Sequence, residues 1–185
     1  MKGKVAYGLL KLLGWKIVGD VPTLPKCILI VAPHTSSWDF PLGVLARAAI
    51  GLRISFIGKA SLFKPPFGFI FRWLGGYPVA RTVSQDTVAF VVSLFNSHEQ
   101  FYFALSPEGT RKYTPKLRTG FYQIALQAQV PIVMVGFDFS RKEVQIQPPF
   151  MPTGDRKADF EFILGYFRNV KGYYPEQGII DQRVD

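Results

Sequence analysis

Residues 28–39 of the chain read Ile-Leu-Ile-Val-Ala-Pro-His-Thr-Ser-Ser-Trp-Asp. The apolar, β-branched run that opens this stretch is typical of a buried strand, and the proline ends it, so that His34 emerges at the strand's end. Residues five apart on one helix face away from each other, so His34 and Asp39 can meet only if the backbone turns between them. The Thr-Ser-Ser sequence supplies turn and capping chemistry, and Pro41 is tolerated only in a first helical turn. The stretch therefore predicts a strand, a turn and a helix that begins near Asp39.

A carboxylate that faces back towards a histidine can prepare that histidine to accept a proton. Asp39 in this position would fix the tautomer of His34 and support the imidazolium that forms, which is the arrangement of a general base. The same residues also allow a structural interpretation, in which Asp39 caps a helix and His34 is a buried, hydrogen-bonded histidine. The spacing alone leaves both interpretations open.

Apolar runs of strand length alternate with helical patterns along the rest of the chain. Strands are predicted near residues 28–32, 54–58, 77–80, 101–105, 131–137 and 144–146, and helices near 39–49, 84–97, 119–128 and 155–171. This order predicts one α/β domain over residues 1–185, with a mostly parallel central sheet of about six or seven strands flanked by helices. Ligands collect at the carboxyl ends of such strands. His34, Arg81 and Glu108–Arg111 each follow a predicted strand, so one rim of the sheet should gather them.

Four blocks of the sequence together resemble the signature blocks of the glycerol-3-phosphate and lysophosphatidate acyltransferase superfamily. The blocks are His34-Thr-Ser-Ser-Trp-Asp39, a segment from Gly58-Lys59 to Gly75-Gly-Tyr-Pro-Val-Ala-Arg81, Ser106-Pro-Glu-Gly-Thr-Arg111, and Val130-Pro-Ile-Val-Met-Val135. The resemblance covers residues 27–135. The family usually has Phe or a similar residue in place of Ser106, and often an acidic residue in place of Ala80.

The resemblance implies transfer of a fatty acyl group from an acyl-CoA or acyl-carrier-protein thioester to the hydroxyl of a lysophospholipid such as lysophosphatidate. His34 would be the general base and Asp39 would hold its ring. The expected substrate-binding residues are Lys59, Arg81, Glu108, Gly109, Thr110 and Arg111. The two arginines suit a phosphate, because the planar guanidinium bonds its oxygens in pairs, and Lys59 is a weaker third candidate. Gly109 would let the backbone approach the substrate, Thr110 would add a hydroxyl donor, and Glu108 would orient an arginine or bind an acceptor hydroxyl.

Composition narrows the classes of partner and cofactor. A net charge of +9 calls for an acidic partner. With only two histidines and one cysteine, the chain has few of the usual ligands of a metal cluster, and we expect no metal. We also expect no cofactor beyond the thioester co-substrate. Cys27 precedes an apolar strand and is interpreted as a core thiol.

Two segments suit an anionic membrane surface. Residues 1–16 alternate basic and apolar residues at a helical period, which fits either a membrane-surface helix or a helix packed on the domain. In residues 60–73, five aromatic side chains are interleaved with cations. No apolar run reaches the ~20 residues of a membrane span, and no signal-peptide cleavage site is present. We therefore expect a cytoplasmic protein, peripheral to the inner face of the cell membrane.

Three other functions remain open at this level. A non-catalytic protein that binds anionic lipid could keep the same fold, although the intact His-Asp pair speaks against it. The same base could also serve an amine acceptor, which would make the protein an N-acyltransferase. A nucleic-acid-binding module would fit the charge and the aromatic content, but no nucleic-acid-binding motif is present, and we expect no nucleic-acid partner.

Overall fold

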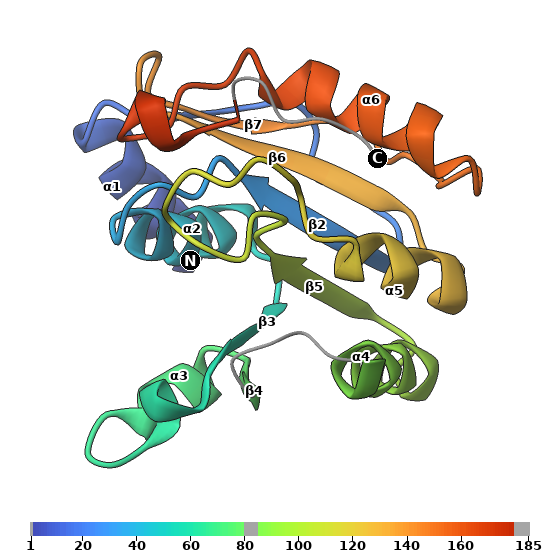
Figure 1. The fold of residues 1–185 in the computed structure, drawn as a ribbon. Helices are drawn as coiled ribbons and strands as arrows, with labels where there is room; N and C mark the ends of the chain where they lie inside the picture. The colour runs from blue at the N-terminus through green and yellow to red at the C-terminus, as the bar shows by residue number, and fades with distance from the viewer. Residues whose placement is uncertain (1, 80–84, 180–185) are drawn as a thin grey trace.

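The computed structural model describes residues 2–79 and 85–179, which form a seven-stranded sheet with helices on both faces (Figure 1). The strands are β1 (Lys16–Val18), β2 (Lys26–Ala32), β3 (Ile54–Lys59), β4 (Gly76–Val79), β5 (Phe101–Leu105), β6 (Ile132–Asp138) and β7 (Glu143–Ile146). The helices are α1 (Lys2–Leu12), α2 (Asp39–Ile50), α3 (Gly68–Trp73), α4 (Gln85–Ser97), α5 (Gly120–Ala128) and α6 (Arg156–Phe167), with short 3₁₀ helices η1 (Ala60–Phe63) and η2 (Pro175–Gln177).

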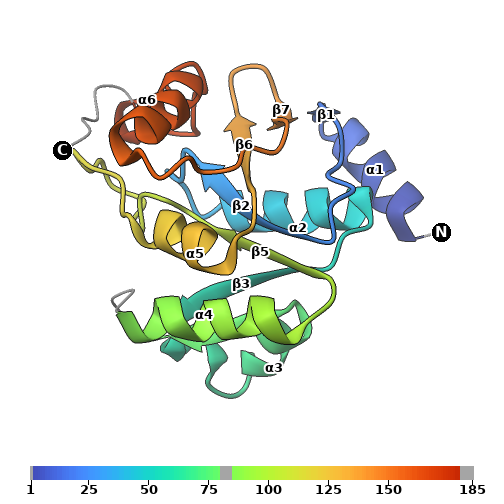
Figure 2. The same cartoon turned by 90° about the vertical axis from the view of Figure 1, so that its right-hand side faces the viewer.

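The strand order is β1-β7-β6-β2-β5-β3-β4, and every neighbouring pair is parallel except β6 and β7. Helices α1 and α2 cover one face, and α4, α5 and α6 cover the other (Figure 2). Because successive side chains of a strand point to opposite faces, Ile28 and Ile30 of β2 enter the core under α4–α6, whereas Cys27 and Leu29 enter the core under α1 and α2. The predicted α/β architecture is confirmed.

The register of the central strands creates the rim on which the site is built. Strands β2 and β5 are parallel, and Ile30 lies opposite Leu105. Both strands end within two residues of this pair, so the loop that begins at Pro33 and the loop that begins at Ser106 leave the sheet side by side. This is the physical reason why His34 and Glu108, which are 74 residues apart, lie close together.

The structure contains several short elements that the sequence pattern did not predict. The segment 1–16 divides into α1 and the start of the three-residue edge strand β1, and η1 and α3 form within the aromatic segment 60–74. The last helix ends at Phe167 rather than at residue 171. Helix α1 packs against α2 through buried Ala6 and Leu10, as one of the two interpretations of this segment required.

Cys27 is fully buried, and burial raises the pKa of its thiol to about 12, in keeping with a core residue. Within residues 2–79 and 85–179, no helix combines the length and the apolar character that crossing a bilayer requires.

Candidate active site

The loop between β2 and α2 folds back on the side chain of Asp39. Oxygen Oδ2 of Asp39 accepts a hydrogen bond from Nδ1 of His34 at 2.8 Å. The same oxygen accepts from the backbone N–H groups of Thr35 at 3.0 Å and Ser36 at 2.9 Å. These two backbone bonds close the turn, and they hold the buried carboxylate at the first turn of α2, where the helix dipole favours negative charge. The turn predicted between the histidine and the aspartate is therefore present.

The hydrogen bond to Asp39 sets the tautomer of His34. A carboxylate oxygen can only accept, so Nδ1 of His34 carries the proton and Nε2 keeps its lone pair. About a third of the His34 side chain is exposed, whereas that of Asp39 is 5% exposed. Oxygen Oδ1 of Asp39 is buried and finds no hydrogen-bond partner among the residues that the structure describes. The pair therefore has the geometry of a general base held by a buried acid.

Glu108 occupies a different place from the one expected of a substrate-binding residue. Its side chain is buried, Oε1 accepts from the backbone N–H of His34 at 2.8 Å, and Oε2 accepts from Oγ of Ser106 at 2.7 Å. Both oxygens thus face donors of the protein rather than an arginine or the solvent. Burial raises the pKa of this carboxyl, and the two hydrogen bonds oppose the shift. Glu108 joins the loop after β5 to the loop after β2 and positions His34 through its backbone.

The remaining candidates of the Ser106–Arg111 block also lie at this rim. Gly109 has a φ of +64°, a backbone conformation that favours glycine, so the turn itself accounts for this residue, and the side chain of Arg118 lies against it. The hydroxyl of Thr110 accepts from the backbone N–H of Lys112 at 3.2 Å. Arg111 donates from its guanidinium to the hydroxyl of Ser37, in the loop that holds the His-Asp pair.

The other two expected cations are Lys59 and Arg81. Lys59 is exposed at the end of β3 and lines neither of the two hollows described below. Arg81 lies outside the described residues.

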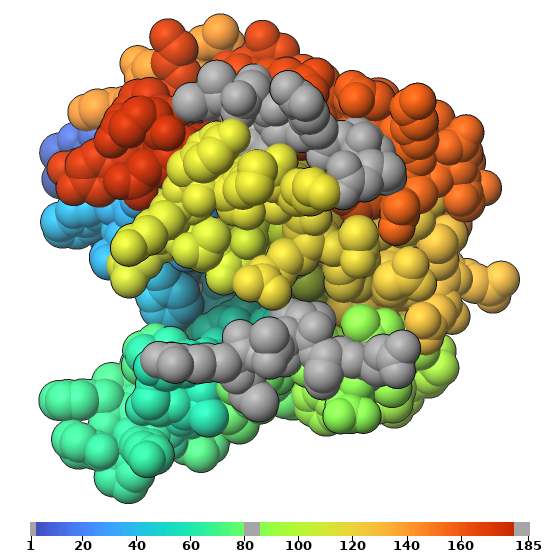
Figure 3. Space-filling view, viewed as in Figure 1, coloured from blue at the N-terminus to red at the C-terminus, as the bar shows by residue number. Residues whose placement is uncertain are grey.

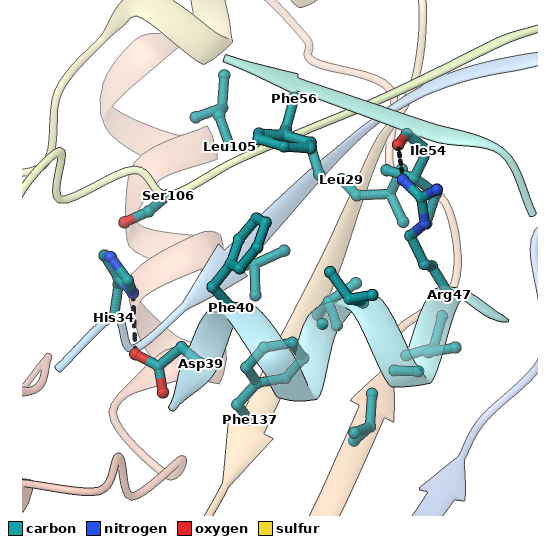
Figure 4. Close-up of a pocket in the computed structure, with 18 of the residues that line it drawn as sticks. Leu29, His34, Asp39, Phe40, Arg47, Ile54, Phe56, Leu105, Ser106 and Phe137 are labelled. Atoms are coloured by element: carbon teal, nitrogen blue, oxygen red, sulfur yellow. Dashed lines mark hydrogen bonds and ion pairs between the residues drawn. The ribbon is translucent and has the colours of Figure 1, made fainter. Parts of the chain in front are cut away.

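An apolar cavity of about 270 Å³ runs from His34 under helix α2 (Figure 4). His34, Asp39 and Ser106 lie at one end, and Arg47 lies at the other. The walls between them come from the inner face of α2 and from the facing sides of five strands, and they are almost entirely apolar. The lining residues include Leu29, Phe40, Gly43, Val44, Ile54, Phe56, Leu105, Val135 and Phe137. A narrow apolar space that begins at a general base fits an aliphatic chain whose reacting end stays near that base.

Arg47 forms the far end of the cavity. Its guanidinium donates to the carbonyl oxygen of Ile54 at 2.7 Å and to that of Leu74. Partial burial lowers the pKa of this group. Arg47 therefore places a polar group at the point where the apolar space ends.

A second hollow, of about 550 Å³, lies on the other side of the His34 loop and is polar. It is lined by Thr35, Ser36, Ser37, Trp38, Thr110, Arg111, Lys112, Tyr174 and Gln177. The last two come from the C-terminal segment, which packs against the loop after β5 (Figure 3). The backbone N–H of Tyr174 donates to Oγ1 of Thr35 at 3.1 Å, so this segment also holds the His34 loop. With Arg111 and Lys112 in its wall, the hollow suits a phosphate.

Sequence reasoning missed several residues of both hollows. Ser106 was interpreted only as a turn residue, yet it lines the cavity and bonds Glu108. The inner face of α2 contributes Gly43, Arg47 and Ile50, which are spaced at helical intervals. A glycine on this face could have indicated space beneath the helix. Tyr174 and Gln177 carry no such local signal. No group of three metal-ligating side chains lies within residues 2–79 and 85–179.

A comparison with known families places most of the chain in one family. The family model described as Acyltransferase matches residues 19–138, which is more than half of the chain. The chain belongs to the acyltransferase family. The match confirms the acyltransferase class that the resemblance implied. The matched region includes the His-Asp pair and Glu108–Arg111 but ends before Tyr174, so part of the polar hollow lies beyond the family match.

Among solved structures, the acyltransferase chain is similar to the 1-acyl-sn-glycerophosphate (LPA) acyltransferase PlsC from Thermotoga maritima. The two share 21% sequence identity with a TM-score of 0.60, over 89% of this chain and 74% of the PlsC chain. At this identity the likeness shows a shared fold. No curated protein matches the chain significantly in sequence.

Proposed function

We propose that this acyltransferase moves a fatty acyl group from an acyl-CoA or acyl-carrier-protein thioester to the hydroxyl of a lysophospholipid such as lysophosphatidate. The observation that carries the proposal is the position of the His34–Asp39 pair, at the mouth of an apolar cavity and on the same loop that walls a basic, polar hollow. An acyl chain and a phosphorylated headgroup need these two environments on either side of one base.

In the proposed reaction, Nε2 of His34 takes the proton from the acceptor hydroxyl as the hydroxyl oxygen attacks the thioester carbonyl. A new C–O bond forms, the carbonyl carbon becomes tetrahedral, and its oxygen takes the negative charge. When the C–S bond breaks, the imidazolium of His34 returns the proton to the leaving thiolate, which departs as the thiol. Asp39 keeps Nδ1 protonated and stabilises the imidazolium between these two steps. Because a thioester is already activated, the reaction needs no covalent intermediate with the enzyme.

The polar side of the loop accounts for the choice of a phosphorylated acceptor. Arg111 lies in its wall and can bond two phosphate oxygens at once, and Lys112 adds a second positive charge. We assign the same role to Arg81, on the basis of its place in the second sequence block. The proposed site of action is the cytoplasmic, anionic face of the cell membrane, where the product phospholipid is consumed. A net charge of +9 supports this location.

The test is mass spectrometry of lipids after incubation of the purified protein with acyl-CoA or acyl-carrier protein and a panel of acceptors. The panel contains lysophosphatidate, other lysophospholipids, monoacylglycerol and an amine-bearing lipid. We expect a new ester product, with lysophosphatidate or another phosphate-bearing acceptor used best. Exclusive acylation of the amine would replace the proposal with an N-acyltransferase. No product with any pair of substrates, together with vesicle binding, would favour a non-catalytic lipid-binding protein.

A further inference from the structure

The segment of η1 and α3, residues 60–73, presents large apolar side chains to the outside of the molecule. Phe67 is 65% exposed, Phe69 is 68% exposed and Trp73 is 80% exposed, while Leu62 and Ile70 are exposed to a smaller extent. These five side chains are close together in the sequence and belong to one small structural unit. A continuous exposed apolar surface of this kind marks a site of interaction.

Exposed positive charges lie in and beside this segment in the sequence, and negative charge is missing from the sequence around it. Residues 40–79 contain no aspartate or glutamate, although they form more than a fifth of the chain. The exposed cations of the region are Arg53, Lys59, Lys64 and Arg72. Aromatic side chains that project outward among lysine and arginine match the interface of an anionic bilayer, where rings enter the acyl boundary and cations meet the headgroups.

The shape of the segment favours a bilayer over a folded protein partner. The unit of β3, η1 and α3 projects from the body of the molecule (Figures 1 and 3) and forms a convex tip rather than a groove. The tip is also internally fixed, because Arg72 donates to the carbonyl oxygen of Phe63 at 2.9 Å. The ring of Phe71 packs against Phe63 and against Phe40 of α2. The exposed rings therefore sit on an ordered support.

We propose that residues 60–73 are the surface by which this protein docks onto an anionic lipid bilayer, with Phe67, Phe69 and Trp73 inserted at the acyl boundary. Two residues of α2 that contact the segment of α3 also line the apolar cavity. Phe40 lines the cavity and packs on Phe71, and Arg47 lines it and bonds the carbonyl oxygen of Leu74. Docking through α3 thus brings the cavity next to the acyl layer. This second consequence, in which lipid chains pass between bilayer and cavity, rests on the proposed function.

Sedimentation of the full chain with vesicles tests the docking surface. The vesicles are phosphatidylcholine alone or phosphatidylcholine mixed with phosphatidylglycerol. The test variant is Phe69→Ser/Trp73→Ser. Its matched control is Met151→Ser/Phe162→Ser, which removes two other exposed apolar side chains, one before α6 and one within it. A third variant, Leu12→Ser/Leu13→Ser, removes the exposed apolar end of α1 and the residue after it.

We expect the wild type to bind the anionic vesicles at low salt and to be partly released at high salt, because salt shortens the range of the electrostatic attraction. The Phe69→Ser/Trp73→Ser variant should bind at least tenfold more weakly, and the other two variants should stay within twofold of the wild type. Brominated lipids should quench part of the tryptophan fluorescence, and Trp73→Phe should remove the quenched part.

Wild-type binding by the Phe69→Ser/Trp73→Ser variant would overturn the proposal, and so would a wild type that ignores anionic vesicles. Loss of binding only in the α1 variant would move the docking surface to α1. A wild-type dimer that this α3 variant converts to a monomer would show that a second copy of the chain covers the face. Thiol release with water-soluble short-chain substrates should be equal in all variants. Its absence from the wild type would refute the proposed function without touching the docking result.

Discussion

The two hollows on either side of the His34 loop differ in almost every property. The cavity beneath α2 is apolar and ends at Arg47, whereas the hollow against the C-terminal segment is polar and contains Arg111 and Lys112. They share no lining residue. The loop itself contributes His34 to one side and its next four residues to the other. Under the proposed function, this difference is a division of work, in which one side would hold an acyl chain, the other would hold a charged headgroup, and His34 would act between them.

Removal of the base should have the largest effect, because both sides depend on it. His34→Ala should lower kcat for acyl transfer by about 10²- to 10⁴-fold, the usual contribution of a general base. Asp39 keeps its two backbone hydrogen bonds in this variant, so the protein should still fold. The measurement is thiol release from acyl-CoA, with circular dichroism as the check of folding.

His98→Ala is the matched control, because His98 is exposed and bonds only near its own helix. It should keep full activity. A folded His34→Ala protein with wild-type turnover would contradict the assignment of the base.

The polar side should be sensitive to a single arginine. Arg111→Ala should raise KM for lysophosphatidate by about 10- to 100-fold, because a hydrogen bond to a charged group contributes about 1.5–3 kcal/mol. Arg111→Lys should rescue the loss only in part, since a point charge cannot reproduce the paired bonds of a guanidinium. Steady-state kinetics against monoacylglycerol, which has no phosphate, is the control. Equal losses with both acceptors would show that Arg111 acts only by holding Ser37.

The apolar side should respond to a side chain added at Gly43. A Cβ at this position would make only ordinary contact with the ring of Phe137, so the backbone accepts a side chain that projects into the cavity. Gly43→Leu should lower kcat/KM for long-chain thioesters by about tenfold or more and spare short chains, since single methylene groups are distinguished by about 1–3 kcal/mol in apolar pockets. The measurement is the acyl-chain profile of the product.

Gly165→Leu on α6 is the matched control for this change. Nothing lies within 4 Å of a Cβ at Gly165, so both substitutions replace a helical glycine without a clash. Both should stabilise their helix by roughly 1 kcal/mol or less. An unchanged chain profile in Gly43→Leu would remove the acyl chain from this cavity.

The smallest effect should come from Glu108 and should appear in stability. Burial raises the pKa of this carboxyl above its ordinary value of 4.5. The folded protein therefore binds its proton more tightly than the unfolded chain does. The free energy of unfolding should fall as the pH rises from the ordinary pKa to the raised one, and should then level off.

The amide oxygen of Glu108→Gln can still accept from the backbone N–H of His34, and its N–H can donate to Oγ of Ser106. Because this variant carries no charge, its stability relative to the wild type should increase across this pH window. Urea unfolding at pH values from 4 to 8 measures the difference. If the difference in the free energy of unfolding between the variant and the wild type does not change with pH, burial does not raise the pKa of Glu108.

The sequence contained enough to predict the sheet and the His-Asp turn, and the reasons are local. The run 28–32 is apolar throughout and rich in β-branched residues, as is typical of a strand buried on both faces, and the turn residues before Asp39 form the backbone bonds that close the loop. No secondary structure could be predicted for the segment 60–74, because Pro65, Pro66 and Gly68 interrupt both the helical and the strand pattern of apolar residues. Helix α3 is also only six residues long.

The environment of the site could be predicted less well than its residues. The burial of Glu108 depends on the parallel pairing of β2 with β5, and the wall formed by Tyr174 depends on a contact with Thr35 across 139 residues. Neither the strand pairing nor this contact produces a periodic pattern in the sequence. The cavity likewise arises from the gap between α2 and five strands. The only local indication of this space in the sequence was Gly43, which has no side chain.

The most direct test of the division between the two sides is a double-mutant cycle of Gly43→Leu and Arg111→Ala. The measurement is kcat/KM with a long-chain acyl-CoA and lysophosphatidate for the wild type, the two single variants and the double variant. If separate hollows hold the chain and the phosphate, the two losses are independent, and the double variant should show the product of the single effects within about twofold. A double variant no worse than the poorer single variant would contradict the account, because both side chains would then serve one and the same part of the substrate.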